Sequence, residues 1–213
     1  NSFDMKQTSS GNRPAQSTDP TYLNSKEVIS FNGTSDFLTT EATPAGRTGN
    51  FRILMVYSYS STSPGPGAVG GTNYVSTNSA GRIWLDGLNN KQRLFSEAFA
   101  ASGNVGTYFQ DPIVVGAQAF FAKYDSTGKL YYGLNTLTET ASGTTGNSNQ
   151  NWPTNSTIAA GALITSATDN TRFLDRYVNV DLAEMVYVYS DPNAAEMTNW
   201  KDYVNTRYGT IIS

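Results

Sequence analysis

The 213-residue chain contains no cysteine and no histidine. The missing cysteines exclude disulfides and cysteine nucleophiles, and both absences together exclude Cys/His zinc sites. Without histidine the chain also has no Ser-His-Asp type of catalytic triad. These absences exclude a large part of enzyme chemistry.

Charge and long apolar runs are also scarce. Only 15% of the residues are charged, and the net charge is -3. Because Lys and Arg are scattered rather than clustered, the sequence lacks the electrostatic signature of a phosphate-binding surface, and we expect no nucleic acid partner. No run approaches the roughly 18 apolar residues that cross a bilayer, so we expect no membrane partner. The abundant Ser, Thr and Asn suit a surface that faces water, sugars or other proteins.

The length allows a single large β domain. We expect one domain over residues 1–213, which opens with an extended, polar arm over residues 1–26. The sequence starts at Asn1 rather than at a methionine, so we expect the natural protein to continue upstream.

Short strands separated by turns dominate the pattern. Residues 51–60 alternate between two faces that are both apolar, which predicts a central strand. Asn32-Gly33-Thr34-Ser35 predicts a tight hairpin between strands at 27–31 and 36–40. The Pro- and Gly-rich residues 60–71 predict a long loop. Further strands are predicted at 73–77, 82–86, 92–99, 113–121, 129–134, 157–163 and 182–189.

This spacing, with no helical period between strands, predicts an antiparallel sandwich or jelly roll. The exception is the C-terminal end, where Asn193 and Glu196 form an N-x-x-E capping box and Gly209 ends the periodic stretch. A lone helix of about 14 residues is marginal in water, so it must be held against the sandwich by its apolar stripe. That stripe consists of Met197, Trp200, Val204 and Tyr208.

The last strand and helix resemble the close of LamG-like jelly-roll domains in the concanavalin A-like lectin/glucanase superfamily. Those domains commonly end with a D-I-A-E-V-x-x-Y strand, a short turn, an S-x-x-E capped helix and an aromatic-Gly terminus. The matching residues are Asp181, Leu182, Ala183, Glu184, Met185, Tyr189, Asn193, Glu196, Tyr203, Tyr208 and Gly209.

Three further stretches are similar to the same family. SSGNRPAQ (9–16) is similar to its S-G-N-x-x-x-x-Q motif, VISFNGTSDFL (28–38) to its V-x-F-D-G-x-D-D-Y-L hairpin, and KYDSTGKLYYGLN (123–135) to its strand, turn and L-Y-V-N-G strand. Asn32 and Val180 depart from the usual Asp and Gly, and the W-L-D-A strand that usually precedes the S-G-N motif is absent. The resemblance implies an all-β, two-sheet antiparallel jelly-roll sandwich of the concanavalin A-like type with one C-terminal α-helix.

Sugar binding requires an aromatic ring that stacks on a pyranose and polar side chains that bind its hydroxyls. Such a set surrounds the turn in RIWLDGLNNKQR, namely Trp84, Asp86, Asn89, Asn90 and Arg93. Tyr108 and Trp152 are further candidates in loops that rim such sandwiches. The alternative for Trp84 is a place in the core between Ile83 and Leu85, and for Trp152 a lid over a sheet edge.

Glycoside hydrolysis usually requires two carboxyl groups about 5 to 9.5 Å apart. Glucanases of the superfamily carry them in an E-x-D-x-E run, which does not occur here. Asp181 and Glu184 face opposite ways on a regular strand, so we expect Glu184 to accept hydrogen bonds near the helix in a structural role. Asp86 and Glu97 lie on neighbouring predicted strands, which makes them the alternative carboxyl pair. We therefore expect no catalytic residue and no enzymatic activity.

Several relatives bind calcium through loop oxygens, so the resemblance raises the question of a Ca²⁺ site. Hard oxygen ligands are present at Asp86, Asp111, Asp169 and Asn170, but their spacing is not diagnostic, so no metal site is assigned. No other cofactor is expected.

Composition and resemblance together favour a non-catalytic carbohydrate-recognition or adhesion domain. We expect it on an extracellular, cell or phage virion surface, where loops at one edge of the sandwich bind a glycan or cell-surface polysaccharide. The alternative is a structural fibre, spike or decoration module that contacts copies of itself or other surface proteins without a ligand. An unusual glycoside hydrolase is the third hypothesis.

Overall fold

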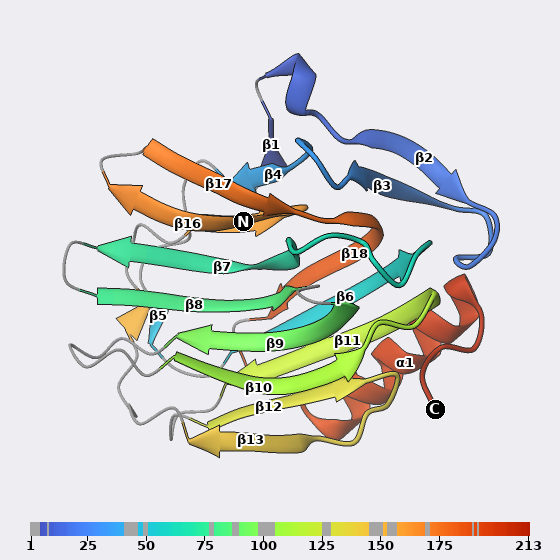
Figure 1. Cartoon of the computed structure of the whole chain (residues 1–213). Helices are drawn as coiled ribbons and strands as arrows, with labels where there is room; N and C mark the ends of the chain where they lie inside the picture. Colours follow the sequence, from blue (N-terminus) through green and yellow to red (C-terminus); the bar gives the residue numbers. More distant parts are fainter. Residues whose placement is uncertain are drawn as a thin grey trace.

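The computed structural model describes residues 5–7, 9–40, 47–48, 51–76, 79–86, 90–97, 105–124, 129–144, 151–152, 157–168, 171–188, 190 and 192–213. Two seven-stranded antiparallel sheets pack face to face, and helix α1 (Ala194–Tyr208) lies against the outer face of one of them (Figure 1). The predicted all-β jelly-roll sandwich with a C-terminal α-helix is confirmed.

The strands are named in chain order. Across sheet A they run β1 (Met5–Lys6), β4 (Leu38–Thr40), β15 (Thr157–Ala160), β7 (Ala68–Ser76), β8 (Ser79–Asp86), β9 (Lys91–Glu97) and β10 (Val105–Pro112). Across sheet B they run β13 (Thr140–Thr144), β12 (Lys129–Leu134), β11 (Gly116–Tyr124), β6 (Phe51–Tyr59), β18 (Asn179–Val188), β3 (Lys26–Asn32) and β2 (Ala15–Asp19). Two small sheets pair β5 (Arg47–Thr48) with β14 (Asn151–Trp152), and β16 (Ala162–Thr168) with β17 (Thr171–Tyr177).

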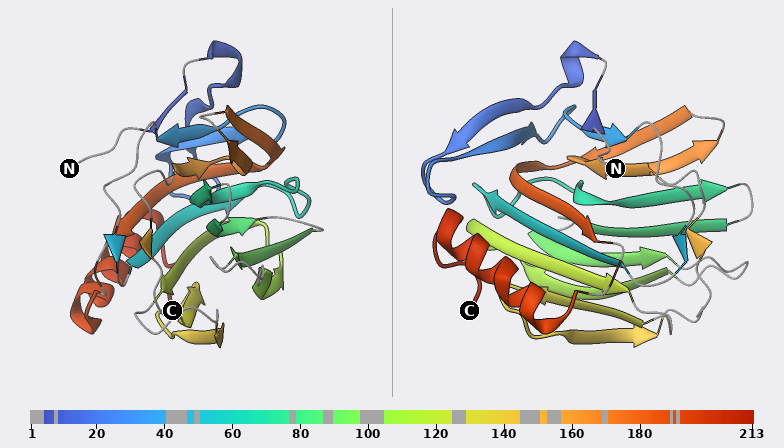
Figure 2. Two further views of the ribbon diagram at one scale, coloured as in Figure 1. Left: turned by 90° about the vertical axis from the view of Figure 1, so that its left-hand side faces the viewer. Right: turned by 180° about the vertical axis from the view of Figure 1, so that it is seen from behind.

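Strand β6 lies near the middle of sheet B and is buried on both faces, as its sequence predicts. Met55 and Tyr57 point into the core between the two sheets. On the opposite face, Val56 packs with Val204 of α1, and Leu54 belongs to a second cluster beneath the helix. Sheet B is therefore the middle of three layers, with α1 on one side and sheet A on the other (Figure 2).

Helix α1 begins at the predicted capping box and packs against the sandwich through the predicted apolar stripe. The side chain of Asn193 accepts a 3.0 Å hydrogen bond from the Glu196 amide, and Glu196 Oε2 accepts one of 2.8 Å from the Asn193 amide. The stripe residues Met197, Val204 and Tyr208 are buried against sheet B, and Trp200 is half-buried. Gly209, with φ of 90°, follows the last helical residue. Within the described residues, no helix is long and apolar enough to cross a membrane.

The turn after β3 is tight but does not form the predicted hairpin, because β3 belongs to sheet B and β4 to sheet A. The carboxamide oxygen of Asn32 accepts hydrogen bonds from the amides of Thr34 and Ser35. Gly33 has φ of +74°, and a Cβ there would lie 3.1 Å from Asn179. Since these local contacts fix the turn without fixing the exit direction of the chain, they are compatible with a crossing between sheets.

A β-bulge in β18 corrects a second prediction. Asp181 pairs with Ser58 of β6, but Glu184 pairs with Val56, so one extra residue lies between them on β18. An extra residue reverses the alternation of faces. Asp181 and Glu184 therefore occupy the same face of sheet B, and the expectation that they face opposite ways is wrong.

Other boundaries differ from the predicted ones. The arm predicted over residues 1–26 contains β1, β2 and the short 3-10 helix Ser10–Asn12. The loop predicted over residues 60–71 is shorter than expected, because its last residues form the start of β7. The strand predicted over 157–163 is divided at Gly161 into β15 and β16. Strands β10, β13 and β17 were not predicted, whereas β12 has the predicted bounds.

Candidate functional site

The β8–β9 hairpin brings three of the predicted sugar-binding residues to neighbouring positions. Trp84 is paired with Phe95, and Asp86 is paired with Arg93. Leu85 is fully buried in the core between the sheets. Because successive residues of a strand alternate between faces, positions 84 and 86 belong to the outer face of sheet A.

The remaining predicted residues lie elsewhere. Tyr108 sits at an irregularity of register in β10, one strand beyond β9. Trp152 is paired with Arg47 in the small β5–β14 sheet, apart from the hairpin. Asn89 lies outside the described residues. Next to it, Asn90 Oδ1 accepts a 2.5 Å hydrogen bond from Ser63 Oγ, which ties the hairpin to the loop before β7.

The register also separates the carboxyl pair considered for catalysis. Asp86 lies opposite Arg93, whereas Glu97 lies opposite Arg82. Four residues of strand therefore separate the two positions, roughly 13 Å at about 3.3 Å per residue. That separation exceeds what glycoside hydrolysis uses.

The described residues contain no group of three or more His, Cys, Asp or Glu that could hold a metal ion. Asp86 and Asp111 lie on β8 and β10 of sheet A. Asp169 and Asn170 lie outside the described residues. The possible calcium site therefore stays a prediction.

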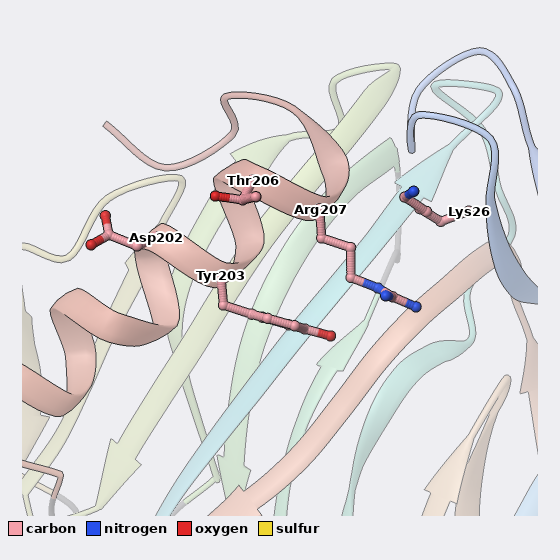
Figure 3. Close-up of a pocket in the computed structure, with 5 residues that line it drawn as sticks. All are labelled: Lys26, Asp202, Tyr203, Thr206 and Arg207. Atoms are coloured by element: carbon pink, nitrogen blue, oxygen red, sulfur yellow. The ribbon is translucent and has the colours of Figure 1, made fainter.

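On the opposite side of the molecule, α1 and the start of β3 form an open groove of about 530 Å³. The described residues that line it are Lys26, Asp202, Tyr203, Thr206 and Arg207. Lys26 opens β3, and the other four come from the C-terminal half of α1. Figure 3 shows Lys26 and Arg207 at one end of the groove, with Asp202 at the other.

Glu184 of β18 lies beside this groove and binds two tyrosines of α1. Its Oε1 accepts 2.6 Å hydrogen bonds from the hydroxyls of both Tyr203 and Tyr208. Arg207 Nε donates a 3.0 Å hydrogen bond to the Tyr208 hydroxyl oxygen and lies 3.8 Å from Glu184 Oε1. The prediction that Glu184 accepts hydrogen bonds near the helix is confirmed.

This arrangement keeps both phenols protonated. The hydrogen bond to Glu184, followed by burial, raises the pKa of Tyr203. Burial, followed by the hydrogen bond to Glu184, raises the pKa of Tyr208. Both hydroxyls therefore remain hydrogen-bond donors across the neutral range, and the carboxylate of Glu184 holds the ring of Tyr203 in place.

Sequence reasoning did not identify this groove. Tyr203 and Arg207 have the i, i+4 spacing that places two side chains on one helix face, beside the apolar stripe. That spacing was the available signal, but a basic residue in the last turn of a helix usually complements the helix dipole. Lys26 comes from the other end of the chain, and only the packing of α1 beside β3 brings it close.

No protein-family model matches the chain, and no curated protein matches it in sequence. Solved structures do match. The globular domain of T. cruzi calreticulin has a TM-score of 0.59 at 8% identity, covering 98% of this chain and 89% of that one. The heptameric SAP-like pentraxin from Limulus polyphemus has a TM-score of 0.53 at 11% identity, covering 77% and 76%.

A virion protein also matches. Tailspike protein 2 of the Escherichia coli O157:H7 bacteriophage CAB120 has a TM-score of 0.56 at 12% identity over 99% of this chain, which spans 27% of the tailspike. At such low identities the likenesses concern the fold alone. They show that the chain has a jelly-roll sandwich architecture.

Proposed function

We propose that the chain is a non-catalytic glycan-recognition domain that binds sugar on the outer face of sheet A, at the β8–β9 hairpin. The observation that carries this proposal is the register that places Trp84 opposite Phe95 and, two residues further, Asp86 opposite Arg93. Two aromatic residues next to a carboxylate and a guanidinium are the groups with which proteins stack and hydrogen-bond a pyranose.

The arrangement of layers supports the same surface. Figure 1 looks onto sheet A, and α1 lies on the far side, against sheet B (Figure 2). Asn90, just before β9, is hydrogen-bonded to Ser63 in the loop before β7. A ligand at Trp84 and Arg93 is therefore bound near the end of β8 and the start of β9, close to that loop.

We assign the chain to the LamG-like domains on the motifs in residues 9–16, 28–38, 123–135 and 181–209. We also place it outside the cell or on a virion, as an adhesion module. A fold by itself does not define a function, because sandwiches of this kind serve in lectins, hydrolases and adaptors. The proposal therefore depends on the residues of the hairpin.

A glycan array with the purified chain tests the proposal. We expect specific binding to a subset of glycans and at least a tenfold loss with Trp84→Ala and with Arg93→Gln. Val186→Ala, at an exposed position on the outer face of sheet B, is the matched control and should bind as the parent does. Thermal melting of each variant shows whether the fold is intact.

Two results contradict the proposal. One is silence of the parent chain across the array, and the other is unchanged binding in both hairpin variants. We further propose that binding needs no metal, so the array signal should persist with a chelator. Release of reducing ends from a bound polysaccharide would instead support the hydrolase hypothesis.

A second candidate is a structural surface module that contacts copies of itself. The observation that favours it is the exposed apolar pair Val114 and Val115 in the turn between β10 and β11, with Val114 58% exposed. Sedimentation velocity distinguishes it from the first candidate. A stable oligomer that Val114→Asp dissociates, in a chain that binds no glycan, would support the structural role.

A further inference from the structure

The groove beside α1 contains a lysine, Lys26, whose ammonium group has no hydrogen-bond or ion-pair partner among the described residues. Lys26 is half-buried at the start of β3. Lysine is more often fully exposed to solvent or paired when it is partly buried. The ammonium of Lys26 is thus able to accept an anionic partner.

Arg207 presents a second, exposed cation on the same side of the groove, although its guanidinium already contacts Tyr208 and forms an ion pair with Glu184 at 3.8 Å. Its guanidinium uses Nε to bind the Tyr208 hydroxyl, and Nε is also its nearest atom to Glu184. Its two terminal nitrogens donate no hydrogen bond within the described part of the chain, and 43% of the side chain is exposed. Figure 3 shows the Arg207 guanidinium and Lys26 on the same side of the groove. A guanidinium held at Nε and open at its fork can bind a carboxylate through two hydrogen bonds.

Between the two ends lies a fixed aromatic ring. Tyr203 is 46% exposed, yet its hydroxyl is held by Glu184 at 2.6 Å. A ring that is already fixed loses little conformational entropy when a ligand covers it. An exposed tyrosine of this kind can stack on the C–H face of a pyranose.

The carboxylates near the groove offset part of its positive charge. Glu184 forms an ion pair with Arg207 at 3.8 Å and accepts two phenol hydrogen bonds, so Lys26 is the cation of the groove that no described residue pairs. Asp202 lies at the other end, and the hydroxyl of Thr206 is between it and Arg207 (Figure 3). The groove therefore has a cationic end, an aromatic middle and an end with a hydroxyl and a carboxylate acceptor.

We propose that this groove binds a carboxylate-bearing sugar. The sugar carboxylate lies on the Arg207 guanidinium and the Lys26 ammonium, its ring covers Tyr203, and its hydroxyls bind Thr206 and Asp202. A neutral sugar leaves the Lys26 ammonium and the terminal nitrogens of Arg207 without a hydrogen-bond acceptor, and a simple anion uses neither the ring nor Asp202. The site lies on the opposite face from Trp84 and does not depend on the glycan site proposed there.

Titration calorimetry with four small probes tests this proposal: a hexuronic acid trisaccharide, a sialylated lactose, and the neutral trisaccharide and lactose that match them. We expect binding of at least one acidic probe, no measurable binding of its neutral counterpart, and weaker binding at high salt. The two acidic probes distinguish uronic from sialic acids as the source of the carboxylate.

Lys26→Gln and Arg207→Gln should each weaken the acidic probe at least tenfold. Lys201→Gln makes the same charge change on α1 outside the groove lining and should leave the affinity unchanged. Because Lys26 has no partner among the described residues, its replacement leaves the fold intact and keeps the test decisive even if Arg207→Gln lowers stability.

The variants of the two faces separate this proposal from the preceding one. Trp84→Ala should retain binding of the acidic probe, and Lys26→Gln should retain binding of any glycan that requires Trp84. The proposal is overturned if neither acidic probe binds, if acidic and neutral probes bind equally, or if Lys201→Gln weakens binding as much as Lys26→Gln. It is also overturned if a Glu-rich peptide binds in the groove and the acidic sugars do not displace it.

Discussion

Glu184 of β18 and Tyr208 in the last turn of α1 are joined by a 2.6 Å hydrogen bond from the phenol to the carboxylate. Tyr208 is 3% exposed and the side chain of Glu184 is 25% exposed, so this contact is partly buried. Hydrogen bonds to an ionised acceptor are shorter and stronger than neutral ones. The pair fastens the end of the helix to a central strand of sheet B.

Glu184→Gln should lower the free energy of unfolding by about 1–2 kcal/mol, because a neutral amide replaces the charged acceptor of two phenol hydrogen bonds. A double-mutant cycle with Tyr208→Phe, measured by urea denaturation, should give a coupling energy above about 0.5 kcal/mol. Strictly additive effects would show that the two side chains are energetically independent.

The same pair should make stability depend on alkaline pH. Burial, followed by the hydrogen bond to Glu184, raises the pKa of Tyr208 in the folded chain above the usual 10.0. A raised pKa means that the folded state holds the proton more tightly than the unfolded state does. This contribution is fully present below pH 10.0 and is lost as pH rises through the folded pKa.

Urea midpoints from about pH 9 to about pH 11 measure this effect against the ordinary tyrosine pKa. The parent chain should lose stability over this range faster than Tyr208→Phe does. Tyr203 contributes in the same direction, so the variant should keep part of the slope. Parallel curves for the two proteins would contradict the assignment to Tyr208.

Asp181→Asn should stabilise the protein at neutral pH. Burial raises the pKa of Asp181 above 3.8, the Ser30 hydrogen bond opposes the shift, and the charge of Asp19 adds to it. Because the folded pKa is raised, ionisation of Asp181 destabilises the fold as pH rises above 3.8. Asparagine keeps an acceptor for Ser30 without the charge.

The gain from Asp181→Asn should be below about 1 kcal/mol, because the carboxyl group is only half-buried and solvent screens its charge. Melting temperatures at neutral pH and toward pH 3.8 measure it. The difference between the two proteins should narrow as pH falls. A variant that is less stable than the parent at neutral pH would show that the ionised carboxylate is favourable.

Gly161→Ala should destabilise the chain by several kcal/mol or prevent folding. Gly161 has φ of +82°, and a Cβ at this position would overlap the ring of buried Phe31. Gly11→Ala is the matched control, because a Cβ there meets nothing within 4 Å. Circular dichroism of both variants measures the contrast, and equal melting temperatures would contradict the packing at Phe31.

Sequence patterns correctly predicted the elements that depend on residues close together in the chain. The capping box at Asn193 and Glu196 depends on residues three positions apart, and the two apolar faces of β6 are visible as alternation. The turn at Asn32-Gly33 was also visible, but the same turn chemistry serves a hairpin and a crossing between sheets. Its outcome is decided by β18, which pairs with β3 where β4 had been expected.

The sites show the same limit. Trp84 and Arg93 are close in sequence, and a hairpin between them was enough to place them on adjacent strands. The alternation of faces along a strand gave the wrong face for Glu184, because a bulge of one residue leaves no clear signal in the sequence of β18. Lys26 and Arg207 line the same groove only because β3 and α1 pack side by side. No short-range sequence pattern predicts that packing.

The position of β18 between β6 and β3 governs the order in which the chain can be assembled. The ribosome releases β2 and β3 well before β18, which among the described strands is their neighbour in sheet B beyond each other. Pairing between such distant segments is slow, because a long loop must close before any contact forms. A nascent chain that stalls before residue 179 therefore displays two open strand edges, and these are the places where it should first stick to other chains.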